Sequence, residues 1–152
     1  MVDSLYTEAM LLTDEARSYF DGYGTEERDR LDTLGRLTFA CESLKVTTRL
    51  MHVIAWLLAQ KAWRRGEISE EALADPGYRL GAAERSNEAA LAIMPERARE
   101  LAHSSVSLYV RVRRLQQQKF RPVGIVLAGS AAAYEGNSGP VRELLERLER
   151  SI

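Results

Sequence analysis

The sequence has little of what metal sites and covalent cross-links require, with one cysteine and two histidines among its 152 residues. A single cysteine excludes an intramolecular disulfide framework and is typical of a reducing compartment. Cys41, His52 and His103 do not have the spacing of a zinc site. We therefore expect a protein without a bound metal or cofactor.

An excess of charge of one sign and a long hydrophobic run are also missing. Lys and Arg number 21 against 22 Asp and Glu, a net charge of −1. Because nucleic-acid affinity depends on positive charge at the phosphates, we expect no nucleic-acid partner. The longest apolar run, residues 53–59, is far shorter than the roughly 20 residues of a membrane span. Asp3 and Glu8 interrupt any signal-peptide pattern, so the expected location is the cytoplasm without membrane insertion.

What the sequence does contain is helical periodicity. The hydrophobic share of 45% is enough for one buried core. Alternating steps of three and four residues predict a first helix over residues 2–23, with a stripe of Val2, Leu5, Ala9, Leu12, Ala16, Tyr19 and Tyr23. This helix should end at Gly22 and Gly24, since two closely spaced glycines favour a helix end and a turn.

The second helix is expected to be very long, from a cap at Thr25 to Arg65, because no proline interrupts it. At about 1.5 Å per residue, some 40 residues would extend about 60 Å, longer than a domain of this size can cover. The same three-four spacing predicts a seam of Leu34, Leu37, Cys41, Leu44, Thr48, Met51, Ala55, Leu58 and Ala62. We expect Cys41 to be a small buried residue of this seam.

Beyond Leu50 the predicted helix is apolar on all sides. A helix of this kind has to be buried on all sides, and two other helices of one chain can cover only part of it. A second copy is the simplest cover for the rest, so the sequence predicts a homodimer. The candidate core and dimer-interface residues are Leu50, Met51, Ile54, Trp56, Leu57 and Leu58.

A third amphipathic helix is predicted at about Glu96–Gln118, with a stripe of Met94, Ala98, Leu101, Ser105, Leu108, Val112 and Leu115. Ser69 should cap a short helix over residues 70–74, whereas residues 78–94 remain ambiguous. The expected fold is all-α: a three-helix bundle with one very long central helix over residues 1–118, followed by residues 119–152 with a short C-terminal helix on a flexible joint.

The predicted C-terminal helix has an apolar face made by Val141, Leu144, Leu145 and Leu148. The spacing i, i+3, i+4, i+7 is that of a helix that lies in a groove. Either the helix docks on its own bundle or a partner protein binds it, and deletion of residues 137–152 would separate the two.

The charges are unevenly distributed. Residues 1–32 contain nine acidic and three basic residues, whereas residues 99–121 contain six basic residues and one acidic residue. Complementary helices that pack side by side would explain this asymmetry. The alternative is a basic surface that binds an acidic partner protein or nucleic acid, with Arg111, Arg113 and Arg114 as the candidate residues.

Thr47, Thr48 and Arg49 interrupt the apolar part of the second helix. The structural interpretation is that the threonines bond back to carbonyls one turn earlier and that Arg49 pairs with an acid of the first helix, Glu8 or Glu15. A role in partner recognition is the alternative.

Catalysis is not predicted. No acid lies at a helical spacing that would orient His103 beside its neighbouring serines, and the sequence has no nucleophile-elbow pattern. His52, on the apolar helix, is expected to pack in the core or at an interface.

One segment carries a family resemblance. Residues 42–60 (ESLKVTTRLMHVIAWLLAQ), followed by Arg65-Gly66-Glu67 and Tyr78-Arg79-Leu80, resemble the bacterial family of regulators of CtrA degradation, which also carries an uncharacterised-domain label. Roughly the first two thirds of the chain take part in the resemblance.

The resemblance implies a dimeric three-helix bundle without enzymatic activity. Members of that family act as proteolytic adaptors that help the ATP-dependent ClpXP protease degrade the cell-cycle regulator CtrA and other substrates, together with further adaptor proteins. The expected partners are therefore a second copy, the protease complex, and its substrates or adaptors. A dimeric scaffold in another signalling complex and, less favoured, a helical DNA-binding regulator are the alternatives.

Overall fold

The structure is a computed structural model that describes residues 1–119, 147 and 150. The chain divides into two units, Met1–Gln117 and Gln118–Ile152. We call the first unit the helical body. Its elements are helices joined by short connections, with no strand among the described residues, so the expected all-α class is confirmed.

The first long helix, α1 (Val2–Ser18), continues into a wider π-type turn, η1 (Tyr19–Tyr23), and then into the short helix α2 (Gly24–Asp29). The helical path bends at Gly22, whose φ and ψ are −122° and −111°. Gly24 has to be glycine because a Cβ there would lie 2.5 Å from the carbonyl oxygen of Tyr19. The predicted helix end at these two glycines is confirmed.

The central helix α3 (Thr33–Arg64) begins later than the sequence predicted. Asp32 is its N-cap, and the Asp32 carboxylate accepts the amide hydrogen of Gly35 at 2.7 Å. The predicted cap, Thr25, instead donates its hydroxyl to the carbonyl of Gly22. The expectation of one helix from Thr25 is therefore wrong, because a cap at Asp32 separates α2 from α3. The remaining 32 residues extend about 48 Å.

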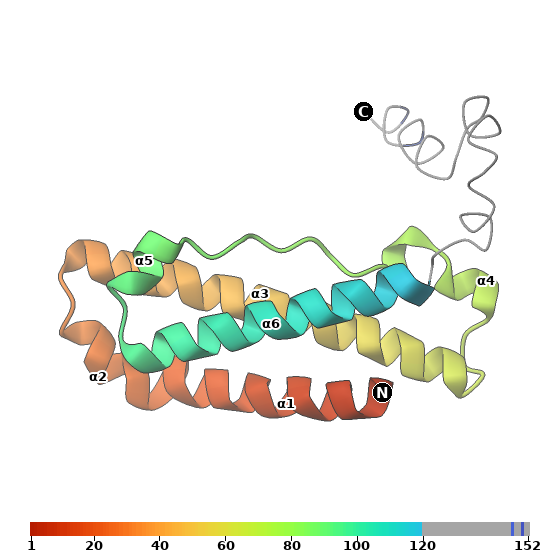
Figure 1. The fold of residues 1–152 in the computed structure, drawn as a ribbon, viewed down its shortest axis with the longest axis horizontal. Coiled ribbons are helices and arrows are strands. Elements are labelled where there is room, and N and C mark those ends of the chain that lie inside the picture. Colours follow the sequence, from red (N-terminus) through yellow and green to blue (C-terminus); the bar gives the residue numbers. More distant parts are fainter. Residues whose placement is uncertain (120–146, 148–149, 151–152) are drawn as a thin grey trace. The chain divides into compact units, whose positions relative to one another are not determined.

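After α3 come α4 (Glu70–Leu73), the 3-10 turn η2 (Pro76–Tyr78), α5 (Glu88–Ala92) and α6 (Glu96–Lys119). The predicted third helix corresponds to α6. The predicted short helix corresponds to α4, which Ser69 caps as expected. Residues 79–87 between η2 and α5 are extended, and Figure 1 shows them as a green thread along the edge of the helical body opposite α1.

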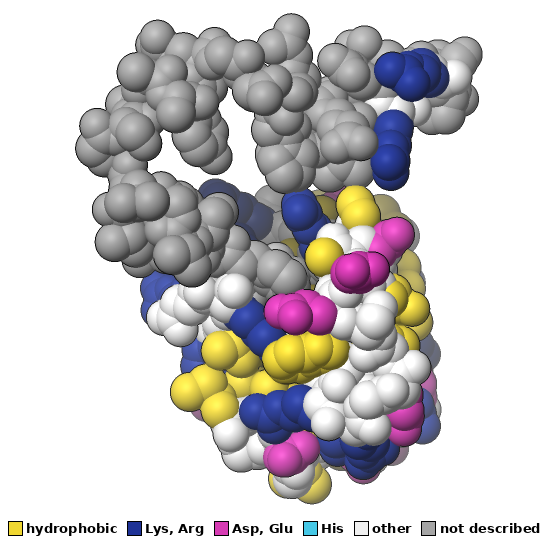
Figure 2. Space-filling view, turned by 90° about the vertical axis from the view of Figure 1, so that its right-hand side faces the viewer, with side chains coloured by type: hydrophobic (Ala, Val, Ile, Leu, Met, Phe, Trp, Pro, Cys, Tyr) yellow, Lys and Arg dark blue, Asp and Glu magenta, His cyan; other side chains and the backbone are white. Residues whose placement is uncertain are grey.

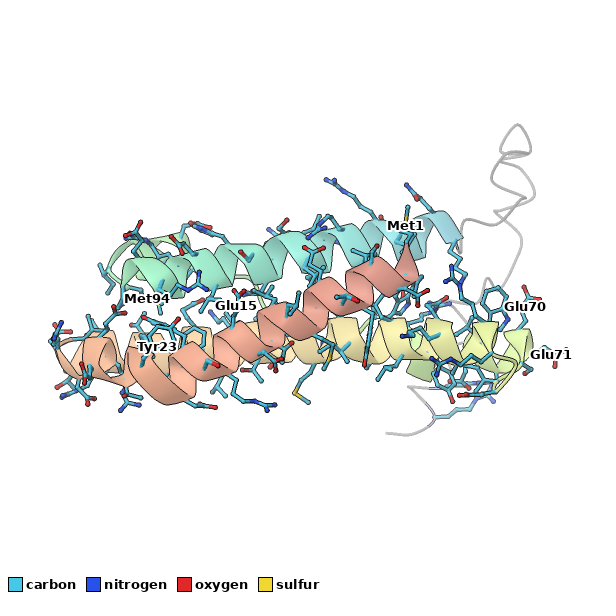
Figure 3. The ribbon with its side chains drawn as sticks, turned by 90° about the horizontal axis from the view of Figure 1, so that it is seen from below. Met1, Glu15, Tyr23, Glu70, Glu71 and Met94 are labelled. Atoms are coloured by element: carbon cyan, nitrogen blue, oxygen red, sulfur yellow. The ribbon has the colours of Figure 1, made fainter. Side chains whose placement is uncertain are left out.

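The helices α1, α3 and α6 lie side by side and share one core. Figure 3 shows α1 passing across α3 with α6 beside it. The stripes predicted for the first and third helices mostly face this core. It includes Val2, Ala9, Ala16 and Tyr19 of α1 and η1, Val46, Leu50, Val53 and Leu57 of α3, and Ala98, Leu101, Leu108 and Val112 of α6.

None of the helices in the described ranges is long and apolar enough to cross a membrane. The candidate residues Val141, Leu144, Leu145 and Leu148 lie outside the described residues. Of the segment predicted as a C-terminal helix, the structure describes Arg147 and Arg150, both helical.

The start of α3 can be tested by removing its cap. We expect Asp32→Ala to lower the free energy of unfolding by about 1 kcal/mol, because the amide of Gly35 loses its side-chain acceptor. Asp32→Ser, which retains a capping oxygen, is the matched control and should lose less. Urea unfolding followed by circular dichroism measures both; equal losses in the two variants would argue against the cap.

Candidate interaction surfaces

The helix α3 carries two lengthwise stripes with three-four spacing, and the structure decides which one faces the core. The buried stripe is Gly35, Phe39, Glu42, Val46, Arg49, Val53, Trp56 and Gln60. Glu42, Arg49 and Gln60 make it the more polar of the two, yet it packs against the rest of the helical body. A purely hydrophobic criterion would have selected the other stripe.

The second stripe, which we call the α3 seam, is the one that the sequence periodicity predicted. Its members Leu34, Leu37, Cys41, Leu44, Thr48, Met51, Ala55 and Leu58 are exposed. Leu34, Leu37, Leu44, Met51 and Leu58 are 66%, 61%, 67%, 63% and 46% exposed. The stretch from Leu34 to Leu58 is about 36 Å long. A row of large exposed apolar side chains of this length is the usual mark of an interaction surface.

The six candidate interface residues are divided between the core and this seam. Leu50, Trp56 and Leu57 are buried within one chain, and Ile54 is partly buried against the same core. Met51 and Leu58 are exposed on the α3 seam. Beyond Leu50 the helix thus has apolar side chains both in the core and on the surface, and its own chain already covers half of the candidates.

The sequence prediction for Cys41 is wrong, because this residue is exposed on the α3 seam. The seam itself was recognised from its spacing, including Leu34, Leu37 and Leu44. What sequence reasoning missed is that these leucines face outward, since periodicity identifies a stripe and not its direction.

Arg49 is the most unusual buried side chain, with 2% of its surface exposed. Its guanidinium donates to the hydroxyl of Ser105 on α6 at 3.2 Å, and to the carbonyl of Glu84 at 2.9 Å and the hydroxyl of Ser86 at 2.7 Å. Burial lowers the pKa of the Arg49 guanidinium, and the nearby charge of Glu42 partly opposes this shift. Arg49 therefore links α3 to α6 and to the extended segment.

The predicted partners of Arg49 were wrong. Glu8 and Glu15 of α1 instead form ion pairs with Arg111 and Arg97 of α6. Figure 3 shows Glu15 between α1 and α6. Arg49 lies on the side of α3 that faces α6 and the extended segment. The sequence does not show which side of α3 faces α1, so it could not identify the partners of Arg49.

Beside Arg49, the carboxylate of Glu42 is buried and accepts from the ammonium of Lys45 at 3.0 Å. Its second oxygen has no hydrogen-bond partner among the described residues. The predicted back-bonding of threonine is confirmed at Thr47, whose hydroxyl donates to the carbonyl of Ser43. Of the three residues that interrupt the apolar helix, Thr47 and Thr48 are exposed, whereas Arg49 belongs to a buried polar cluster with Glu42.

Acidic side chains of α1 form ion pairs with basic side chains of α6. The Arg111 guanidinium bonds the Glu8 carboxylate and holds the pKa of Glu8 below its usual value. This pairing agrees with complementary packing of the two helices. Of the other two basic candidates, Arg113 lies over the ring of Tyr109, 5.9 Å from its centroid, and Arg114 is exposed. The end of the helical body seen in Figure 2 likewise has basic, acidic and apolar side chains interspersed.

The two histidines occupy different environments. His103 lies 3.5 Å from the carboxylate of Glu88, an acid that helical spacing missed because it comes from α5, and both side chains are exposed. His52 is half-buried, and its Nδ1 has no partner in the described part of the chain. Residues 1–119, 147 and 150 contain no group of His, Cys, Asp or Glu side chains that could hold a metal ion.

The described part of the chain is thus an all-helical protein with three long packed helices, a buried polar cluster and an exposed apolar seam. The chain belongs to the family described as "Protein of unknown function (DUF1465)", whose model matches residues 1–152. Among solved structures, it is similar to RcdA from Caulobacter crescentus CB15, with 34% sequence identity and a TM-score of 0.64. The similarity covers 78% of this chain and 89% of that chain. No curated protein matches the chain.

These comparisons confirm the family resemblance found in the sequence. The segment that carries it, residues 42–60, includes members of both stripes of α3 together with Glu42, Lys45 and Arg49.

The buried cluster makes a prediction about stability. We expect Arg49→Lys to lower the free energy of unfolding by roughly 2 kcal/mol, because an ammonium cannot reach the three acceptors that the planar guanidinium serves. Arg114→Lys, on the exposed side of α6, is the matched control and should change stability by less than about 0.5 kcal/mol. Chemical denaturation measures both, and indistinguishable variants would contradict the buried position.

Proposed function

We propose that the protein is a non-catalytic, cytoplasmic adaptor that assists ClpXP-dependent degradation of CtrA and related substrates through protein–protein contacts. The observation that carries this proposal is the similarity to RcdA, at 34% identity over 78% of this chain and 89% of that chain. The quoted segment of α3 belongs to the same resemblance. An adaptor of this kind raises the local concentration of a substrate at the protease without performing chemistry itself.

The exposed surfaces support protein partners. The α3 seam is apolar and long, as expected of a surface that binds another protein. The basic residues of α6 offer less to nucleic acid than the sequence suggested, because Arg97 and Arg111 are already paired with acids of α1. We therefore favour contacts with proteins and assign Arg113, Arg114, Val141, Leu144, Leu145 and Leu148 as candidate partner-binding residues.

We further propose that the α3 seam pairs with the same seam of a second copy, so that two three-helix bundles form a homodimer. Its three-four spacing is that of a coiled-coil interface, in which identical helices bury their apolar side chains against each other. The neighbouring cations do not oppose this pairing, because Lys45 and Lys61 each lie beside an acid of their own chain.

The adaptor role predicts a gain in degradation. In a reconstituted reaction with ClpXP and the further adaptor proteins that act with this family, addition of this protein should accelerate the loss of CtrA. Deletion of residues 137–152 should abolish the acceleration and leave the melting temperature of the helical body unchanged if the C-terminal segment binds a partner.

The rate of CtrA loss, followed on gels, measures this effect, and a substrate that ClpXP degrades without an adaptor is the control. No acceleration by the full chain would contradict the adaptor role. If the protein still forms dimers in that case, the result would favour the alternative of a helical scaffold in another signalling complex.

The homodimer makes a separate prediction. The chain should sediment at twice its mass of 17.1 kDa, whereas Leu44→Glu and Met51→Glu should sediment as monomers, because a charge in the seam would be buried without a partner. Analytical ultracentrifugation measures the mass.

The matched control is Leu11→Glu on α1, since Leu11 is 60% exposed and lies outside the seam. This variant should remain a dimer. Dissociation by Leu11→Glu, or dimers of both seam variants, would place the interface elsewhere.

A further inference from the structure

The extended segment of residues 79–87, which we call the strap, lies along α3 and α6 without secondary structure of its own (Figure 1). It begins after η2 and ends at Asn87, whose side chain caps α5 by accepting from the amides of Ala89 and Ala90. An extended chain of nine residues can span about 30 Å. The strap thus follows a large part of the two helices beneath it.

The strap is held mainly through its main chain. The amide of Leu80 donates to the side chain of Gln116 at 2.7 Å, and the carbonyl of Gly81 accepts from the hydroxyl of Tyr109 at 2.7 Å. The carbonyl of Glu84 accepts from Arg49 at 2.9 Å. Contacts of this kind bind an extended chain regardless of its side chains, as in proteins that bind peptides in extended form.

Apart from Ser86, whose hydroxyl accepts from Arg49 at 2.7 Å, the side chains of the strap contribute little to its attachment. Ala82, Glu84, Arg85 and Asn87 are exposed, and none of the nine residues is buried. Leu80 is the member that packs against the core, and it is only partly buried. A segment with few buried apolar contacts belongs to the part of a fold that opens most easily.

The surface beneath the strap has an excess of positive charge and a buried nitrogen without a hydrogen-bond partner among the described residues. Arg49 donates there to neutral acceptors, and the charges of Arg49, Lys45 and Glu42 sum to +1. The imidazole of His52 lies directly under Gly81, where a Cβ would come within 2.7 Å of Nδ1, and this nitrogen has no partner among the described residues. A carboxylate in the groove would balance the charge, and a polar group could satisfy His52.

We propose that the strap covers a groove for an extended polypeptide, and that an extended acidic segment of a partner protein occupies this groove when the strap swings out. Gln116, Tyr109 and Arg49 then bind the main chain of the partner, and Arg49 also meets its carboxylate. The strap acts as an intramolecular competitor that keeps the groove closed. The proposal concerns a surface distinct from the α3 seam and does not depend on the adaptor role.

The strap can be released without altering the groove residues that bind the main chain. In Gly81→Ala, the new Cβ would lie 2.7 Å from the ring of His52, so either the strap or this ring has to move. Gly77→Ala is the matched control, since its Cβ would meet only the carboxylate of Asp75, at 3.2 Å. The double variant Gly81→Ala with His52→Ala removes the collision and should restore docking.

Hydrogen exchange measures release of the strap. We expect faster exchange over residues 79–87 in Gly81→Ala and unchanged exchange in the middle of α3 and α6. Fluorescence anisotropy reports binding of a fluorescein-labelled peptide with the sequence of residues 78–88. This peptide should bind Gly81→Ala at least about tenfold more tightly than the wild type. In the wild type the docked strap leaves only a small fraction of the protein molecules able to bind the peptide.

Two further comparisons test the chemistry of the groove. A peptide with aspartate in place of Ser86 should bind Gly81→Ala more tightly than the parent peptide, because its carboxylate meets Arg49. Addition of Tyr109→Phe to Gly81→Ala should weaken both peptides, because the hydroxyl that donates to the main chain at Gly81 is lost.

The proposal is wrong if the strap exchanges faster in Gly81→Ala and neither peptide binds, or if it exchanges faster and peptide affinity is the same as in the wild type. Should Gly81→Ala fail to fold, or leave the strap protected because the ring of His52 moves instead, a protease site inserted after the exposed Glu84 allows the folded protein to be nicked. The nicked protein should then bind the labelled peptide more tightly than the intact protein does. Equal affinity, or no binding, would contradict the proposal.

Discussion

The burial of one guanidinium, that of Arg49, is the interaction on which the arrangement of the helical body depends. A buried cation is stable only where hydrogen bonds replace its water, and Arg49 obtains them from Ser105 of α6 and from Glu84 and Ser86 of the strap. Because those acceptors come from separate parts of the chain, Arg49 brings α6 and the strap together on one side of α3 while the strap is docked. The same requirement directs the polar stripe of α3 inward.

The orientation of α3 has a consequence for its surroundings. With Glu42 and Arg49 inside, the more apolar stripe, from Leu34 to Leu58, is left on the surface. The helix therefore offers two faces: one that its own chain covers, where Glu42, Arg49 and Gln60 lie among core side chains, and an exposed apolar face that suits another protein. Along the edge of the helical body opposite α1 (Figure 1), the strap lies against Arg49, Tyr109 and Gln116, which it contacts mostly through its main chain.

Much of the fold was predictable because it depends on local chemistry. The ends of the first helix follow from Gly22 and Gly24, and the stripe from Met94 to Leu115 identified α6 with its correct buried face. The start of α3 was not predicted, since caps at Thr25 and Asp32 are both plausible locally. Complementary packing of the acidic first helix and the basic third helix was suggested by charge. The individual pairs were not, because Glu8 and Glu15 were assigned to Arg49 instead of Arg111 and Arg97.

By itself, the sequence determined that the chain is helical, where its long helices lie, and that α3 has more apolar surface than two neighbouring helices can cover. Periodicity and helix-end residues act over a few positions, so they can be recognised without knowledge of the fold. Only the tertiary structure decided which stripe of α3 is buried and which residues surround Arg49. That choice depends on acceptors more than 30 positions away in the chain, which no local pattern encodes.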